Sequence, residues 1–134
     1  MTCPLLFVYG TLQRSSFHPM ARFLQDRARF LAVANVPGRL YDLGDYPGLT
    51  LARDPSDRVH GELFRLHDPD TTLGELDMYE GADAESNLYQ RSLVPITCED
   101  GTSGDGQTLA WAYFYLPAVD EERWVPSGRW PVGG

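Results

Sequence analysis

Short apolar stretches alternate with glycine, proline and polar residues along the whole chain, and this pattern predicts about six or seven short strands. Tight turns are expected at residues 46–48 and 54–57. Pro95 lies inside one apolar stretch, which indicates an edge strand or a bulge at that point. The last stretch is apolar on both of its alternating faces and is expected to pack on both sides. The predicted strands are residues 5–9, 30–36, 39–43, 49–51, 59–66, 88–98 and 109–116.

Two other segments have the spacing of helices. Residues 19–27 carry apolar side chains at helical spacing, and a proline occupies the first helical position. In the second segment, Asp68 is expected to cap a helix whose first residue is Pro69. This helix is predicted to run to about Glu80 and to stop at Gly81.

The order of these elements predicts an α+β fold. Strands mostly follow strands through short turns, which favours a small mixed, mostly antiparallel β-barrel flanked by the two helices. A doubly wound nucleotide-binding fold would instead need strands and helices in alternation. The 134 residues correspond to one domain, in which residues 117–134 are expected to form an extended C-terminal tail packed over the body.

Composition and charge exclude several classes of protein. The chain is 43% apolar and 22% charged, as in globular proteins rather than disordered, collagen-like or coiled-coil chains. Its net charge of −8 argues against sequence-independent binding to nucleic acid and against docking to anionic membranes. All 11 basic residues are arginines, which excludes Schiff-base, pyridoxal-phosphate and Walker A lysine chemistry.

The sequence gives no sign of a metal site, a cofactor or a membrane segment. Cys3 and Cys98 are too few for a disulfide framework and wrongly spaced for zinc. The histidines also lack a recognisable metal-ligand spacing. The apolar run at residues 5–9 is too short for a membrane span or a signal-peptide core, so we expect a cytoplasmic protein.

The end of the second predicted helix carries a candidate acid/base. Glu80 shares a helical face with Leu73 and Leu76, so the pattern points it inward at the last turn. Burial and the negative end of the helix dipole would both raise the pKa of its carboxyl, as general acid/base catalysis requires. Alternatively, Glu80 is solvated at a frayed helix end or pairs with Arg91. Asp77, one turn earlier, is the second candidate carboxylate.

The end of the first predicted strand carries a candidate binding turn, formed by Tyr9, Gly10, Thr11 and Leu12. A strand that ends at glycine can turn sharply and point its N–H groups outward, which creates an anion-binding concavity without a cation. An ordinary strand-ending glycine is the alternative. Tyr89 is expected to form a wall of the substrate-binding pocket or to brace it through a hydrogen bond.

The chain contains four notable sequence blocks in order. They are FVYGTL at residues 7–12, GRLYDLGDYPG at 38–48, VHGELF at 59–64, and LDMYEG at 76–81 followed by YQR at 89–91. Taken together, these blocks resemble the gamma-glutamylcyclotransferase-like superfamily. This resemblance covers roughly residues 5–116 and implies a small mixed β-barrel flanked by helices. Members often continue the first block with basic residues and a glycine, whereas this chain continues with Gln-Arg-Ser-Ser, a difference that bears on substrate recognition.

The resemblance also implies a reaction. The α-amine of a small-molecule γ-glutamyl amide attacks the substrate's own side-chain carbonyl, which gives 5-oxoproline and a free amine without metal or cofactor. Glu80 would be the acid/base, and the turn of residues 9–12 would bind the substrate's α-carboxylate. The leaving amine stays open, and the protein is expected to be a monomer or a homodimer. The alternative is a non-catalytic barrel of the same fold that binds a small molecule or a partner.

Overall fold

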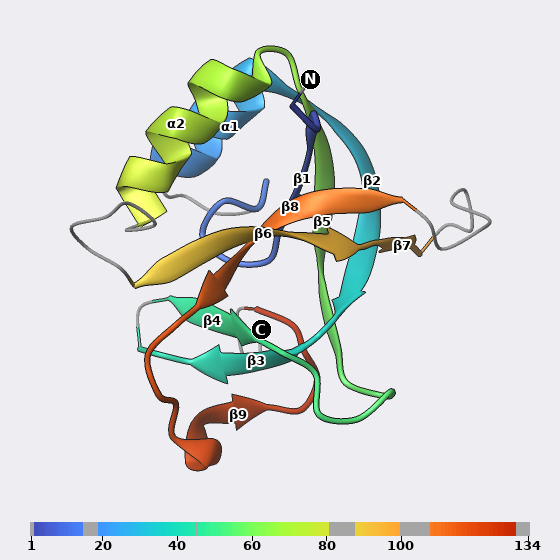
Figure 1. Ribbon diagram of the computed structural model, residues 1–134, viewed down its shortest axis with the longest axis vertical. Coiled ribbons are helices and arrows are strands. Elements are labelled where there is room, and N and C mark those ends of the chain that lie inside the picture. The colour runs from blue at the N-terminus through green and yellow to red at the C-terminus, as the bar shows by residue number, and fades with distance from the viewer. Residues whose placement is uncertain (1, 15–18, 45, 81–87, 100–107, 131–134) are drawn as a thin grey trace.

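In the part of the chain that the structure describes, nine strands form one curled sheet, and two α-helices pack against it (Figure 1). The structure, a computed structural model, describes residues 2–14, 19–44, 46–80, 88–99 and 108–130. The helices are α1 (Pro19–Arg27), α2 (Pro69–Glu80) and the 3₁₀-helix η1 (Glu121–Arg123). The strands are β1 (Leu5–Val8), β2 (Ala28–Pro37), β3 (Arg39–Asp42), β4 (Pro47–Thr50), β5 (Arg58–Leu66), β6 (Tyr89–Pro95), β7 (Thr97–Cys98), β8 (Leu109–Tyr115) and β9 (Trp124–Val125).

The curl of the sheet is closed by the stretch of chain that holds β6 and β7. β5 pairs with β1 and β2, and β1 pairs with β8. β6 then pairs with β8 while β7 pairs with β2, and only Ile96 separates β6 from β7. β8 runs parallel to β1 and β4, and the other pairings are antiparallel. The predicted α+β fold with a mixed, mostly antiparallel sheet is therefore confirmed.

The sheet forks along β8. Leu6 of β1 lies opposite Trp111 in the first half of β8, whereas Leu49 of β4 lies opposite Phe114 in the second half. β1 therefore leaves β8 where β4 replaces it, and the layer of β4, β3 and β9 continues from that point (Figure 1). This fork lies directly beside the end of β1, where the sequence predicts the binding turn.

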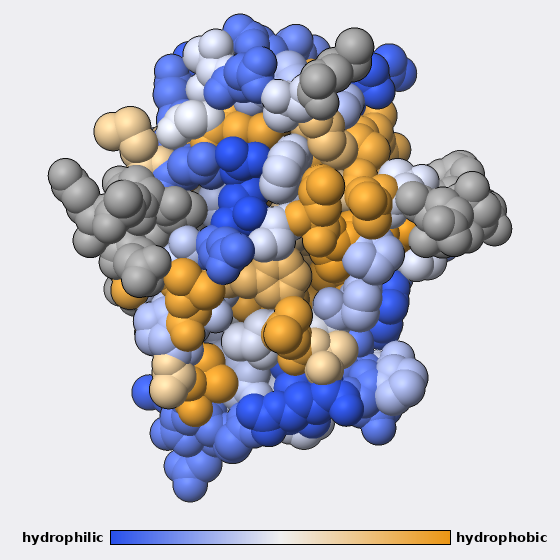
Figure 2. All heavy atoms as spheres, in the orientation of Figure 1, coloured by the Kyte–Doolittle hydropathy of each residue, from blue (hydrophilic) through white to orange (hydrophobic). Residues whose placement is uncertain are grey.

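Apolar side chains are buried on both faces of the sheet, as the pattern of residues 109–116 predicts. Ala110 and Ala112 of β8 belong to the core inside the curl. Tyr113 of the same strand belongs to a second core between the sheet and the two helices. The second core also contains Leu6, Val8, Leu12, Leu24, Phe64, Leu66, Leu73, Leu76 and Tyr89. Part of the sheet outside this helix cover is apolar as well, and Figure 2 shows apolar residues over the β6–β8 side of the molecule.

One predicted turn is wrong. Pro47 and Gly48 lie inside β4 rather than in a turn, and the chain reverses earlier, where the N–H of Leu43 donates to the carbonyl of Tyr46 at 3.0 Å. Gly44 has a φ of +110°, a conformation that glycine adopts readily. Pro47 fits at the first position of a strand, where its missing N–H costs least.

Two further predictions need correction. The single strand expected over residues 88–98 is divided into β6 and β7, with the break immediately after Pro95. The C-terminal segment is not simply extended, since it contains η1 and β9. These two changes account for nine strands instead of seven. The predicted helix stop at Gly81 and most of the polar connection before β8 lie outside the described residues.

The two helices begin where their prolines predict. α1 starts at Pro19 and α2 at Pro69, directly after Asp68. With 9 and 12 residues, neither of these α-helices reaches the length of about 20 residues that a membrane span requires.

Candidate active site

Tyr9 joins two strands at the fork. Its side chain is buried, and its hydroxyl donates to the carbonyl of Tyr113 in β8 at 2.6 Å. The same hydroxyl accepts the N–H of Leu49 in β4 at 3.2 Å. One side-chain oxygen therefore serves two backbone groups where β1 no longer accompanies β8. This fixes the start of the predicted binding turn relative to both strands.

Gly10 allows a close approach between the turn and β4. A Cβ atom at this position would lie 2.7 Å from Cγ of Pro47, too near for any side chain without movement of β4. Among the described residues, the glycines with positive φ are Gly38, Gly44 and Gly128, so Gly10 serves close packing rather than a left-handed conformation. The chain then reverses in a turn closed by the N–H of Gln13, which donates to the carbonyl of Gly10 at 3.1 Å.

Three successive N–H groups of this turn have no partner among the described residues. Within the part of the chain that the structure describes, the backbone N–H groups of Gly10, Thr11 and Leu12 have no acceptor. The Leu12 side chain is buried in the core beneath the helices and ties the turn to it. Adjacent N–H groups of this kind can bind an anion without a cationic side chain.

The second half of the turn is held by two distant segments. The Gln13 side-chain amide donates to the carbonyl of Trp130, in the C-terminal segment, at 3.2 Å. The Arg14 backbone N–H and Nε donate to the two carboxylate oxygens of Glu62 in β5, at 2.8 and 3.2 Å. These contacts hold the turn in place before any ligand arrives, which reduces the entropy cost of binding.

Tyr89, at the start of β6, supports the turn through Pro47. Its buried hydroxyl donates to the Pro47 carbonyl at 3.0 Å, and its ring packs edge-on against Tyr115 with the ring centroids 5.3 Å apart. Pro47 also packs against Gly10, so Tyr89 and the turn both contact this residue. Tyr89 therefore makes a hydrogen bond to β4, whereas its bracing of a pocket and its contact with a substrate stay predictions.

Glu80 is the last residue of α2, and its side chain lies outside what the structure describes. Leu73 and Leu76, which share its face by helical spacing, are both fully buried against the sheet. The apolar face of the helix therefore turns inward as predicted. The inward direction of the Glu80 carboxyl and its raised pKa stay predictions.

One turn before Glu80, Asp77 connects α2 to two strands. Arg91 of β6 donates to both of its carboxylate oxygens, from Nε at 2.7 Å and from Nη2 at 3.0 Å. The hydroxyl of Tyr113 in β8 donates to Oδ1 at 2.7 Å. The hydrogen bond to Asp77 raises the pKa of the Arg91 guanidinium above its usual value, against the opposing effect of burial. Arg91 thus has Asp77 as its carboxylate partner in the described structure.

The role of Tyr113 is missed by sequence reasoning. The apolar pattern identifies it as a strand residue of the core, and this is correct. Its hydroxyl meets Asp77 across 36 positions of sequence, and Tyr113 stands opposite Arg91 in the β6–β8 register. No local signal in the sequence indicates this register.

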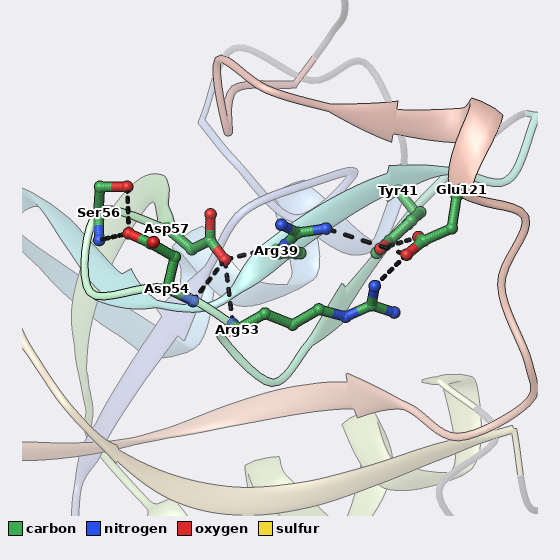
Figure 3. A network of polar contacts seen from close by, with 7 residues as sticks. All are labelled: Arg39, Tyr41, Arg53, Asp54, Ser56, Asp57 and Glu121. Carbon is green, nitrogen blue, oxygen red and sulfur yellow. Dashed lines mark hydrogen bonds and ion pairs between the residues drawn. The ribbon is translucent and has the colours of Figure 1, made fainter.

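A separate polar network holds the C-terminal segment against the body (Figure 3). Arg39 of β3 donates to Asp57 at 2.9 Å, and the backbone N–H of Arg53 donates to the same oxygen at 3.0 Å. Glu121 of η1 accepts from the Tyr41 hydroxyl and from the Arg53 guanidinium. The Arg39 hydrogen bond lowers the pKa of the Asp57 carboxyl, and the Tyr41 hydrogen bond lowers that of Glu121.

Among the described residues, no three His, Cys, Asp or Glu side chains come together as a metal site would require. His60 of β5 instead lies 2.6 Å from Glu99, and Asn35 donates to the same carboxylate at 3.3 Å. These side chains connect β5 and β2 to the segment after β7.

Comparison with known proteins gives a family and a relative that both match nearly the whole chain. Residues 6–132 match the family described as "Gamma-glutamyl cyclotransferase, AIG2-like". The chain is 32% identical over 127 residues to a Vibrio cholerae protein named "Putative gamma-glutamylcyclotransferase", with 94% of each chain covered.

Solved structures show the same fold at lower identity. A mouse AIG2-like protein superposes with a TM-score of 0.77 at 21% identity, and the match covers 98% of this chain and 90% of that one. YkqA from Bacillus subtilis superposes with a TM-score of 0.68, also at 21% identity. That match covers 95% of this chain and 39% of YkqA, so there the fold is one part of a longer protein.

Proposed function

Since this chain belongs to the gamma-glutamyl cyclotransferase, AIG2-like family, we propose that it converts a γ-glutamyl amide into 5-oxoproline and a free amine. The α-amine of the substrate forms a bond to its own γ-carbonyl carbon, and the bond from that carbon to the leaving nitrogen breaks. The reaction needs a folded substrate conformation and the movement of two protons from the α-ammonium nitrogen, which becomes the lactam N–H, to the leaving nitrogen, but no nucleophile from the protein.

This proposal rests on the N–H groups of the turn that have no acceptor among the described residues. Gly10, Thr11 and Leu12 offer three backbone donors that no described residue uses, on a turn held by Pro47, Glu62 and Trp130. A fixed α-carboxylate on these donors would position the adjacent α-amine for attack. The acidic chain supplies this anion site with backbone dipoles rather than with lysine.

Glu80 is proposed as the acid/base. Its carboxylate takes the two protons of the substrate's α-ammonium group one after the other and passes each to the leaving nitrogen, so the enzyme ends in its starting state. The burial of Leu73 and Leu76 supports this role, because it turns the corresponding face of α2 toward the sheet. The C-terminal position on the helix supports it too, since the helix dipole there favours the protonated carboxyl.

The test measures 5-oxoproline release from γ-glutamyl amino acids, γ-glutamylamines and glutathione-like peptides, with wild type beside Glu80→Gln. We expect kcat of Glu80→Gln to fall by about 10²-fold or more, since glutamine cannot transfer the proton. Glu75→Gln is the matched control because Glu75 is an exposed carboxylate of the same helix, and it should retain wild-type activity. The best substrate in the panel identifies the amine.

The same panel tests the turn. It includes 4-aminobutanoyl amides, which keep the attacking amine, the carbonyl and the leaving amine but lack the α-carboxylate. These amides close to 2-pyrrolidinone instead of 5-oxoproline, so release of the free amine is measured for both series. Their kcat/KM should be lower by about tenfold or more, because they lose charge-assisted hydrogen bonds to the turn. Equal rates for the two series would remove the turn from substrate binding. Activity that persists in Glu80→Gln would reject Glu80, and a folded protein that releases no 5-oxoproline would favour the binding barrel.

A further inference from the structure

Tyr113 touches both halves of the candidate site through two different groups. Its backbone carbonyl accepts the hydroxyl of Tyr9, which directly precedes the Gly10 turn, at 2.6 Å. Its own hydroxyl donates to Oδ1 of Asp77, one helical turn before Glu80, at 2.7 Å. A single residue of β8 thus connects the turn to the end of α2.

The Asp77 carboxylate is already occupied by the protein. Its two oxygens accept three hydrogen bonds, two from Arg91 and one from Tyr113. A carboxylate has about four lone-pair positions, so little acceptor capacity remains for a substrate proton. The two-pronged Arg91 contact is directional and fixes the carboxylate in its plane as well as in distance. This arrangement fits a residue that holds structure in place rather than one that transfers protons.

The last turn of α2 needs such an attachment. Leu73 and Leu76 are fully buried, but Met78 and Tyr79 beyond them are 72% and 39% exposed. Apolar packing therefore weakens along the final turn, where helices tend to fray. Asp77 lies between these two regions and is bound to two strands of the sheet.

We propose that Asp77, held by Arg91 and Tyr113, is a positioning residue that fixes the last turn of α2 at a set distance from the Gly10 turn. This inference rests on the proposed function, in which Glu80 at the end of that turn moves the proton. A displacement of about 1 Å between acid/base and substrate is enough to lower a rate by about 10²-fold. Asp77 acts through Glu80 and does not touch the reacting atoms.

The experiment compares Asp77→Asn with wild type in kinetics and in amide hydrogen exchange. Asparagine keeps the size of the side chain but loses the charge that pairs with Arg91. We expect kcat to fall by about tenfold or more while KM stays within about twofold, and the pH profile of kcat to keep its acidic limb. Amide protons of residues 77–80 should exchange about tenfold faster. Glu75→Gln should change none of these values.

A second variant shows whether Tyr113 belongs to the same unit. Tyr113→Phe removes the hydroxyl that reaches Asp77 but keeps the carbonyl that binds Tyr9. It should lower kcat in the wild-type background and have little further effect in Asp77→Asn, since the effects of coupled residues are not additive.

Three results would overturn the inference. Unchanged exchange at residues 77–80 in Asp77→Asn would reject the attachment, whether or not the protein is active. An unchanged kcat in an active protein would reject the positioning role. Loss of the acidic limb in Asp77→Asn, together with an active Glu80→Gln, would make Asp77 the acid/base. If wild type releases no 5-oxoproline, the proposed function fails and the positioning role fails with it, while exchange still decides the attachment.

Discussion

At the scale of single residues, the Tyr9 side chain forms hydrogen bonds with the backbone of two strands at the fork of the sheet. The Tyr9 hydroxyl supplies both a donor and an acceptor to backbone groups of two strands. A phenylalanine in the same place would bury the same ring but would remove both of these hydrogen bonds. What Tyr9 contributes beyond the packing of its ring therefore comes from its hydroxyl group.

We expect Tyr9→Phe to lower the free energy of unfolding by about 1–3 kcal/mol, because two buried hydrogen bonds are lost. Urea denaturation followed by circular dichroism measures this change. Tyr46→Phe is the control, since the Tyr46 side chain is exposed, and it should stay within about 0.5 kcal/mol of wild type. A Tyr9→Phe protein as stable as wild type would contradict the bridging role.

The site could be predicted from sequence only where local spacing carries the information. Helical spacing predicts the inward face of Leu73 and Leu76, which is buried, and a glycine at the end of a strand indicates the turn. The roles of Glu80 and of this turn stay predictions. The contact of Asp77 with Arg91 could not be predicted, because it depends on the register between β6 and β8 and on where α2 crosses them.

Among the elements, the C-terminal segment is held by close packing as well as by strand pairing. Gly128 has a φ of +66°, and a Cβ atom there would lie 2.0 Å from the carbonyl oxygen of Arg58. The N–H of His60 donates to the Gly128 carbonyl at 2.8 Å. The segment then reaches Trp130, whose carbonyl accepts from Gln13 of the binding turn. A displacement of this segment would therefore also disturb the position of the binding turn.

Gly128→Ala should lower the free energy of unfolding by about 1–3 kcal/mol, because it combines an unfavourable φ with a backbone clash. Chemical denaturation measures this value. Gly74→Ala gives a control of opposite sign, since Gly74 lies in α2 with open space at the Cβ position. There alanine should stabilise by about 0.5–1 kcal/mol through helix propensity. A neutral Gly128→Ala would show that the segment is free to move aside.

The elements themselves differ in how far sequence predicts them. α1 and α2 match their predicted bounds because proline and the Asp68 cap are local signals. The β3–β4 turn was predicted at the wrong residues, and the break between β6 and β7 was not predicted. Both depend on strand limits, which are set by partners elsewhere in the chain. β9 escaped prediction since its two residues form a strand only against β3.

At the scale of the whole molecule, acid stability should depend on the network around Arg39. The pKa of Asp57 is lowered by the Arg39 hydrogen bond, and that of Glu121 by the Tyr41 hydroxyl. In both cases the folded-state pKa lies below the unfolded value, so the unfolded chain binds more protons as the pH falls. The stabilisation is complete above the unfolded pKa of about 4 and is lost as the pH falls through the folded pKa.

Urea midpoints should therefore be nearly constant from about pH 7 to pH 5 and should fall steeply below about pH 4. Asp57→Asn should be less stable at neutral pH and should lose less stability on acidification. Asp26→Asn removes a carboxylate whose side chain is 63% exposed, and its acid profile should follow wild type. Identical acid slopes for Asp57→Asn and wild type would show that this network does not govern acid unfolding.

The parallel pairing of β1 with β8 has a consequence for synthesis on the ribosome. Tyr9 and its acceptor Tyr113 are 104 positions apart, and the chain between them contains every strand from β2 to β7. A nascent chain can pair β1 with β5 early, but the fork cannot form until β8 has left the exit tunnel. Assembly of the turn and the helix end into one site therefore waits for β8. Until then the edge of β1 that later pairs with β8 stays open to other chains, a period in which chaperones would have most effect.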